Sequence, residues 1–224
     1  LLDNAPYLTE GAVAAKLADK VGFYDDAEKA AKDRAGDGSD VVPISAYYAR
    51  EGSPYAYPYS KDGAIALIAV DGAIVDGASG EDAYNGRVAG GDTIAASVRA
   101  AADDPRVKAI LLRVNSPGGS ALASDVMLDA LRKAQGRGKK VVVSMGGVAA
   151  SGGYWISMYA DAVFASPATI TGSIGVLSGK VMLRETYRLA GLNPVSIGIG
   201  KNADMYSEFA DWTPEQRVKF EATL

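Results

Sequence analysis

The stretch from Met145 to Trp155 combines residue types and spacing that suit nucleophilic chemistry. It reads Met-Gly-Gly-Val-Ala-Ala-Ser-Gly-Gly-Tyr-Trp, so Ser151 has small residues on both sides. A β-branched run at 141–143 precedes it and a helix-compatible run at 154–160 follows it. Small neighbours let a substrate backbone approach the hydroxyl, and a serine at a strand-to-helix junction lies close to free helix amides. Ser151 is therefore a candidate nucleophile, and the alternative is an N-capping serine at a glycine-rich helix start.

Two residue types that usually assist such a serine are missing from the sequence. It contains no histidine and no cysteine. Imidazole bases, thiol nucleophiles and disulfides are thereby excluded, and a zinc site would lack its commonest ligands. We expect no metal and no cofactor. If Ser151 is a nucleophile, its general base must be a lysine or a carboxylate.

Composition narrows the class of protein further. The 224 residues are 48% hydrophobic and carry a net charge of −4, which indicates a sizeable core and no electrostatic footprint for nucleic acid. No apolar run reaches the roughly 18 to 20 residues that span a bilayer. The chain begins with Leu1 rather than methionine, so we expect it to start inside a longer gene product.

From residue 64 onward, the sequence alternates between buried-strand and helix patterns. This alternation predicts βα units with right-handed crossovers, an α/β fold and a largely parallel sheet covered on both faces. Strands are expected at 65–70, 73–75, 107–114, 141–143, 162–165 and 194–199. Helices are expected at 10–17, 25–33, 92–102, 124–136, 182–190 and from a capping box at 213–216, with loops at 77–91, 146–153 and 171–175.

Three parts of the chain differ in character, and we take them as its domains. Residues 1–36 read as the closing segment of a preceding repeat. Residues 37–62 are rich in tyrosine and proline and predict a connector that packs on a neighbouring surface. Residues 63–224 form the regular α/β part, with its last helix cut off.

A second candidate element follows the strand at 107–114. Pro117-Gly118-Gly119 lies after that strand, and the segment at 146–153 follows the next one. Because carboxyl ends of parallel strands share one edge of a sheet, we expect the two loops to be neighbours. The amides of Gly118 and Gly152 could then stabilise an oxyanion formed by attack of Ser151. The alternative for the Pro-Gly-Gly sequence is a plain turn.

Three motifs occur together in a recognisable order. Residues 113–120, 145–155 and 171–175 resemble the core motifs of the signal peptide peptidase A (SppA) family, bacterial serine peptidases of the ClpP/crotonase-like fold with repeated β-β-α units. The resemblance covers roughly 64–224 and is strongest to the carboxyl-terminal half of the long, two-repeat form. It implies that Ser151 is the nucleophile, that Gly118 and Gly152 supply the oxyanion hole, and that Ser173 hydrogen-bonds the base lysine. The alternative for Ser173 is an ordinary loop hydroxyl.

The position of the base departs from the short form of this family. Short members carry their lysine immediately before an aspartate, whereas here Ala203 precedes Asp204 and Lys201 lies two residues too early. In the two-repeat form the lysine comes from the amino-terminal half. We therefore expect the base outside this chain and keep Lys201 as the candidate within it.

The resemblance also implies a biological setting. Family members hydrolyse cleaved signal peptides and similar extended apolar peptides at the bacterial inner membrane, on its periplasmic side. We expect a membrane anchor absent from this chain, contact with the preceding repeat, and a homo-oligomer, commonly a tetramer. Two other functions stay open: a crotonase-type acyl-CoA enzyme, which would need an acidic residue near the oxyanion hole, and a catalytically silent scaffold repeat.

Overall fold

A computed structural model describes residues 9–23, 26, 29–30, 33, 64–83 and 86–224. The chain divides into two compact units, one of residues 28–175 and the other of 1–27 with 176–224. Each unit is considered by itself. The predicted connector at 37–62 lies outside the described residues, and so does most of the predicted helix at 25–33. The predicted domain boundaries remain predictions.

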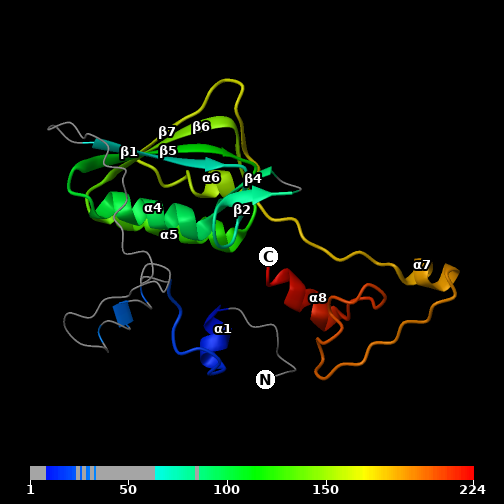
Figure 1. The fold of residues 1–224 in the computed structure, drawn as a ribbon. Coiled ribbons are helices and arrows are strands. Elements are labelled where there is room, and N and C mark those ends of the chain that lie inside the picture. The colour runs from blue at the N-terminus through cyan, green and yellow to red at the C-terminus, as the bar shows by residue number, and fades with distance from the viewer. Residues whose placement is uncertain (1–8, 24–25, 27–28, 31–32, 34–63, 84–85) are drawn as a thin grey trace. The chain divides into compact units, whose positions relative to one another are not determined.

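The larger unit is built on a parallel sheet with the strand order β1-β5-β6-β7 (Figure 1). A further strand, β8, pairs with the end of β6. Every pairing in this sheet is parallel. The predicted α/β class with a largely parallel sheet is therefore confirmed, and the arrangement is consistent with a ClpP/crotonase-like fold. The strands are β1 (Ala64–Asp71), β5 (Val107–Ser116), β6 (Lys140–Ala150), β7 (Ala162–Phe164) and β8 (Ile170–Gly172).

A second, smaller sheet joins the predicted strand at 73–75 to two strands in a region that the sequence predicted as loop. Its strands are β2 (Ala73–Val75), β3 (Gly80–Asp82) and β4 (Gly86–Gly90), in the order β2-β4-β3. The prediction of a loop throughout 77–91 is therefore wrong. β3 is exposed along its length and β4 over its first half, so neither shows the apolar alternation by which a strand is recognised in sequence.

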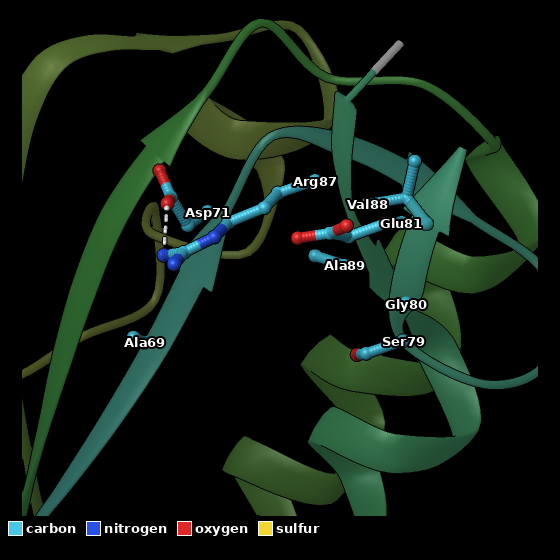
Figure 2. A pocket seen from close by; sticks show the side chains of 8 residues that line it. All are labelled: Ala69, Asp71, Ser79, Gly80, Glu81, Arg87, Val88 and Ala89. Atoms are coloured by element: carbon cyan, nitrogen blue, oxygen red, sulfur yellow. Dashed lines mark hydrogen bonds and ion pairs between the residues drawn. The ribbon is translucent and has the colours of Figure 1, made fainter. Parts of the chain in front are cut away.

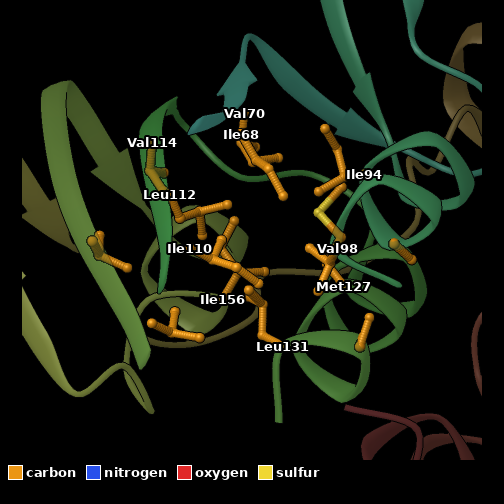
Figure 3. Packing of buried hydrophobic residues seen from close by; sticks show 14 of the residues in the cluster. Ile68, Val70, Ile94, Val98, Ile110, Leu112, Val114, Met127, Leu131 and Ile156 are labelled. Carbon is orange, nitrogen blue, oxygen red and sulfur yellow. The ribbon is translucent and has the colours of Figure 1, made fainter. Parts of the chain in front are cut away.

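Helices α4 (Gly91–Asp103) and α5 (Ala121–Gly136) cover one face of the parallel sheet (Figure 1). Between them and the sheet lies one hydrophobic core, in which Val98 and Met127 of the helices pack with Ile110 and Leu112 of β5 (Figure 3). The opposite face of β1 is open, because the Ile65 and Leu67 side chains are each 69% exposed. The expectation that the sheet is covered on both faces is therefore wrong for this part of β1 among the described residues.

The start of α5 differs from the prediction. Ser120 is the N-cap, and its Oγ accepts a hydrogen bond of 3.1 Å from the Ala123 amide. Ser124, at which the sequence predicted the helix to begin with a serine cap, lies inside the helix. Its side chain is buried, and its Oγ donates to the Ser120 carbonyl over 2.8 Å. Both serines fit a cap by residue type, and the Gly119–Ile74 strand contact fixes the chain reversal just before Ser120.

The smaller unit contains α1 (Thr9–Ala14), α7 (Arg184–Leu189) and α8 (Pro214–Glu221). The predicted capping box at the start of α8 is confirmed, with Thr213 and Gln216 exchanging side-chain-to-backbone hydrogen bonds of 3.1 Å. The predicted strand at 194–199 is wrong. That segment pairs with no strand of the described chain, and its apolar side chains are exposed.

The core predicts a sharp contrast between two leucines of adjacent strands. Leu112 of β5 is fully buried, whereas Leu67 of β1 is 69% exposed. Leu112→Ala should lower the free energy of unfolding by about 2–5 kcal/mol, because it leaves a cavity in the core. Leu67→Ala should cost less than about 1 kcal/mol. Urea unfolding measures both, and equal losses would contradict the described core.

Candidate active site

Ser151 stands at the junction between β6 and the short helix α6 (Gly152–Trp155) in a strained backbone conformation. Its φ is 50° and its ψ is −119°, a region that residues with a side chain rarely adopt. The Ser151 amide donates to the Gly172 carbonyl over 2.9 Å. Ser151 occupies the N-cap position of α6, but its side chain makes no capping hydrogen bond. The strain therefore does not serve helix capping, and such strain clusters at functional sites.

The strand before Ser151 is longer than predicted and contains a bulge. β6 continues to Ala150, so the prediction of a loop over 146–153 is wrong for most of its length. Its pairing with β5 shifts register between two matched pairs, Val114 with Met145 and Ser116 with Ala149. Gly146 permits the close approach there, because a Cβ at this position would lie 2.9 Å from the Asn115 Cβ.

The Pro117-Gly118-Gly119 turn packs directly against the nucleophile candidate. Gly118 has a φ of 98°, and a Cβ on it would lie 2.6 Å from the Gly152 nitrogen and 2.8 Å from the Ser151 Cβ. The turn is held from its other side by Ile74, whose amide donates to the Gly118 carbonyl over 2.9 Å. The two predicted loops are thus neighbours, and they pack too closely for a side chain at position 118.

The Gly118 amide, a predicted oxyanion-hole donor, has a partner within the chain. It donates to the Oγ of Ser116 over 3.1 Å, and Ser116 is fully buried. Ser116 is not among the site residues predicted from the sequence. A serine followed two residues later by a glycine amide is the spacing of a side-chain-to-backbone turn, and that signal could have found it.

Ser173 lies beside Ser151 on the neighbouring strand end. The pair Ala150–Gly172 is the last matched pair of β6 and β8, and each serine is the next residue of its chain segment. Ser173 also has a positive φ, of 49°, and is exposed. Thr171 ties the two strand ends together, because its Oγ1 donates to the Ala149 carbonyl over 2.8 Å.

The described lysines of the larger unit are engaged elsewhere. Between 64 and 175, with 84–85 not described, each has a partner: Lys108 with Pro105, Lys133 with Asp129, Lys139 with Asp104 and Val107, and Lys140 with Asp161. Lys140 opens β6 and lies about 35 Å of extended strand before Ser151. The hydrogen bond that Lys140 donates to the Asp161 carboxylate raises the pKa of Lys140 and so favours its protonated form. Lys201 belongs to the smaller unit, and its carbonyl accepts from the Gln216 side chain.

The close contact at Gly118 generates a prediction with a matched control. Gly118→Ala and Gly138→Ala both place a side chain at positive φ, 98° and 84°, but a Cβ at Gly138 meets nothing within 4 Å. Both variants carry backbone strain, and only Gly118→Ala adds overlap with Ser151 and Gly152. It should lose about 1–3 kcal/mol more free energy of unfolding than Gly138→Ala. Equal losses in urea unfolding would show that the turn does not pack against Ser151 as described.

Comparisons with known proteins agree with this arrangement. Residues 133–224 match the model of Peptidase family S49. The chain is 56% identical to Protease 4 of Salmonella typhi over 119 residues, 53% of this chain and 18% of that protein. Protease 4 of Haemophilus influenzae is 52% identical over 120 residues, 54% of this chain and 19% of that protein.

A plant protein is similar over the same share of the chain. The chloroplastic serine protease SPPA of Arabidopsis thaliana is 40% identical over 125 residues, 55% of this chain and 18% of that protein. The chain thus spans about a fifth of the length of these relatives. The matches are consistent with the carboxyl-terminal half of a longer SppA-type protein. The resemblance to the signal peptide peptidase A family is thereby confirmed, and residues 133–224 of this chain are similar to peptidase family S49.

Proposed function

We propose that this chain is the nucleophile-bearing part of a serine endopeptidase whose base is a lysine outside the chain. One observation carries the proposal: Ser151 is held at positive φ, does not cap α6, and lies against the Gly118 turn. A structural serine needs none of these features. The match of residues 133–224 to a peptidase family supports the same reaction class.

The reaction begins with attack by the Ser151 Oγ on the scissile carbonyl, while the base takes the hydroxyl proton. The carbonyl oxygen becomes an oxyanion, and the Gly152 and Gly118 amides are the proposed donors to it. Each such donor contributes about 3–4 kcal/mol to stabilisation of the transition state. The Gly118 amide then turns from the Ser116 Oγ to the oxyanion. The amine leaves with the proton from the base, and water hydrolyses the acyl group on Ser151.

A lysine can act as this base only in its neutral form. Burial away from water lowers a lysine pKa and provides that form. The described lysines of the larger unit are engaged in other contacts, which supports a base from the preceding repeat. Ser173 follows the strand end next to Ser151 and is proposed to accept a hydrogen bond from that lysine.

The proposed substrates are cleaved signal peptides and similar extended apolar peptides. Ile170 and Ile174 support this class, because their side chains are 69% and 80% exposed on either side of the β8 end that adjoins Ser151. We further propose a homotetramer acting at the bacterial inner membrane, on the periplasmic side. Among the described helices, none has the length and apolar character that crossing a bilayer requires.

Replacement of Ser151 tests the proposed nucleophile. In the full-length protein, Ser151→Ala should abolish covalent labelling by a fluorophosphonate probe and reduce hydrolysis of a signal-peptide-like substrate by at least about 10³-fold. Ser97→Ala is the matched control, because Ser97 is exposed on α4 and its Oγ donates only along its own helix, to the Thr93 carbonyl. Absent labelling of the unaltered protein would favour the acyl-CoA enzyme or the silent scaffold.

Replacement of Lys201 tests the origin of the base. Lys201→Ala in the full-length protein should leave kcat within about twofold of its original value, as an exposed lysine outside a site normally does. Steady-state hydrolysis of the same peptide measures this. A large fall in kcat would assign the base to Lys201 and overturn the proposal of a lysine outside the chain.

A further inference from the structure

The bulge in β6 leaves backbone groups that the parallel ladder does not satisfy. Such groups need other partners, because an unpaired polar group away from water is costly. Three carbonyls of the segment accept hydrogen bonds from side chains: Met145 from Arg113 over 3.0 Å, Gly146 from Thr169 over 2.8 Å, and Ala149 from Thr171 over 2.8 Å. Hydrogen bonds from side chains of the neighbouring strands and loop therefore stabilise the bulge.

Asn115 provides the matching contact to an amide of the bulge. Its Oδ1 accepts from the Val148 amide over 3.3 Å, and its Nδ2 donates to the Asp71 Oδ1 over 2.9 Å. One side chain of β5 thus bridges the end of β1 and the bulge of β6. Asn115 lies three residues before Gly118, and Val148 lies three residues before Ser151. The hydrogen bond between them accordingly joins the two segments that carry the predicted oxyanion donor and the nucleophile.

Asp71 determines which way the Asn115 amide faces. A carboxylate only accepts hydrogen bonds, so it selects the Nδ2 group and leaves Oδ1 for Val148. Asp71 is itself held by Arg87 of β4, with the Arg87 Nη1 and the Asp71 Oδ2 3.4 Å apart in a pocket at the end of β1 (Figure 2). Both side chains of this ion pair are substantially exposed, so it contributes little to stability. The ion pair instead orients the Asp71 carboxylate, which accepts the hydrogen bond from Asn115.

We propose that Asn115, oriented by Asp71, is a positioning residue that sets the offset between Ser151 and the Gly118 turn. The inference rests on the proposed function, because the offset matters only if Ser151 is the nucleophile. Asn115 acts through the backbone of Val148 rather than on the substrate. Its loss should therefore lower kcat and leave KM nearly unchanged.

Three variants of the full-length protein test this role. Asn115→Leu removes both hydrogen bonds at similar volume and should lower kcat by about 10- to 100-fold, as small misplacements of reacting groups do. Asn115→Asp keeps an acceptor for the Val148 amide but places a second carboxylate opposite that of Asp71. Because two facing carboxylates share a proton more readily as pH falls, its kcat relative to the unaltered protein should rise toward low pH.

The decisive test is a double variant that exchanges Asp71 and Asn115, called here the exchanged pair. Asp71→Asn combined with Asn115→Asp restores one donor and one carboxylate in reversed positions, so kcat should return to within about threefold of the original value. Gln135→Leu is the control. Gln135 also bridges two groups by its Nε2, the Tyr159 carbonyl and the Asp161 carboxylate, but it does so on α5 near the start of β6. This variant should leave kcat unchanged.

Hydrogen exchange at the Val148 amide gives a readout that needs no activity. Exchange should be faster in Asn115→Leu and slow again in the exchanged pair. If the unaltered protein hydrolyses peptide but Asn115→Leu keeps its kcat, or the exchanged pair fails to restore it, the inference fails and the proposed function stands. If the unaltered protein neither hydrolyses peptide nor reacts with the fluorophosphonate, both fail.

Discussion

The contact between the Gly118 turn and the Ser151–Gly152 backbone is the constraint on which the rest of the site depends. A single Cβ at Gly118 would lie 2.6 Å from the Gly152 nitrogen, so these two backbones approach too closely for a side chain at position 118. That proximity places the two segments that carry the proposed oxyanion donors next to each other. The surrounding strands and hydrogen bonds hold the two backbones at this distance.

Those supports come from three directions. The parallel sheet brings the ends of β5 and β6 to one edge, and the core beneath it holds Leu112 and Val143 of these strands. The small sheet supplies Ile74, whose amide and carbonyl pair with Gly118 and Ser120. The positive φ of Ser151 is sustained within this frame, where the Ser151 amide is paired with Gly172 of β8.

Much of this architecture could be predicted from local sequence. The apolar runs of β1, β5 and β6, the capping box at Thr213, and the adjacency of the Pro-Gly-Gly turn to Ser151 follow from periodicity and from the shared edge of parallel strands. The features that sequence reasoning missed depend on partners distant in the chain. The strand at 194–199 had the right residue types but no strand to pair with among the described residues, and β3 and β4 pair without an apolar pattern. The role of Asn115 depends on the bulge in β6 and its hydrogen bonds, which link residues distant in the chain. Ser116 is the exception, because its partner Gly118 lies only two residues away.

The central claim is that Ser151 becomes acylated during peptide-bond hydrolysis. Acid quenching of the full-length protein during turnover of a peptide ester, followed by mass spectrometry of the digested protein, tests it directly. We expect an acyl adduct on the peptide that contains Ser151, formed and lost at rates consistent with kcat. Turnover with no adduct, or with an adduct on another residue, would contradict it.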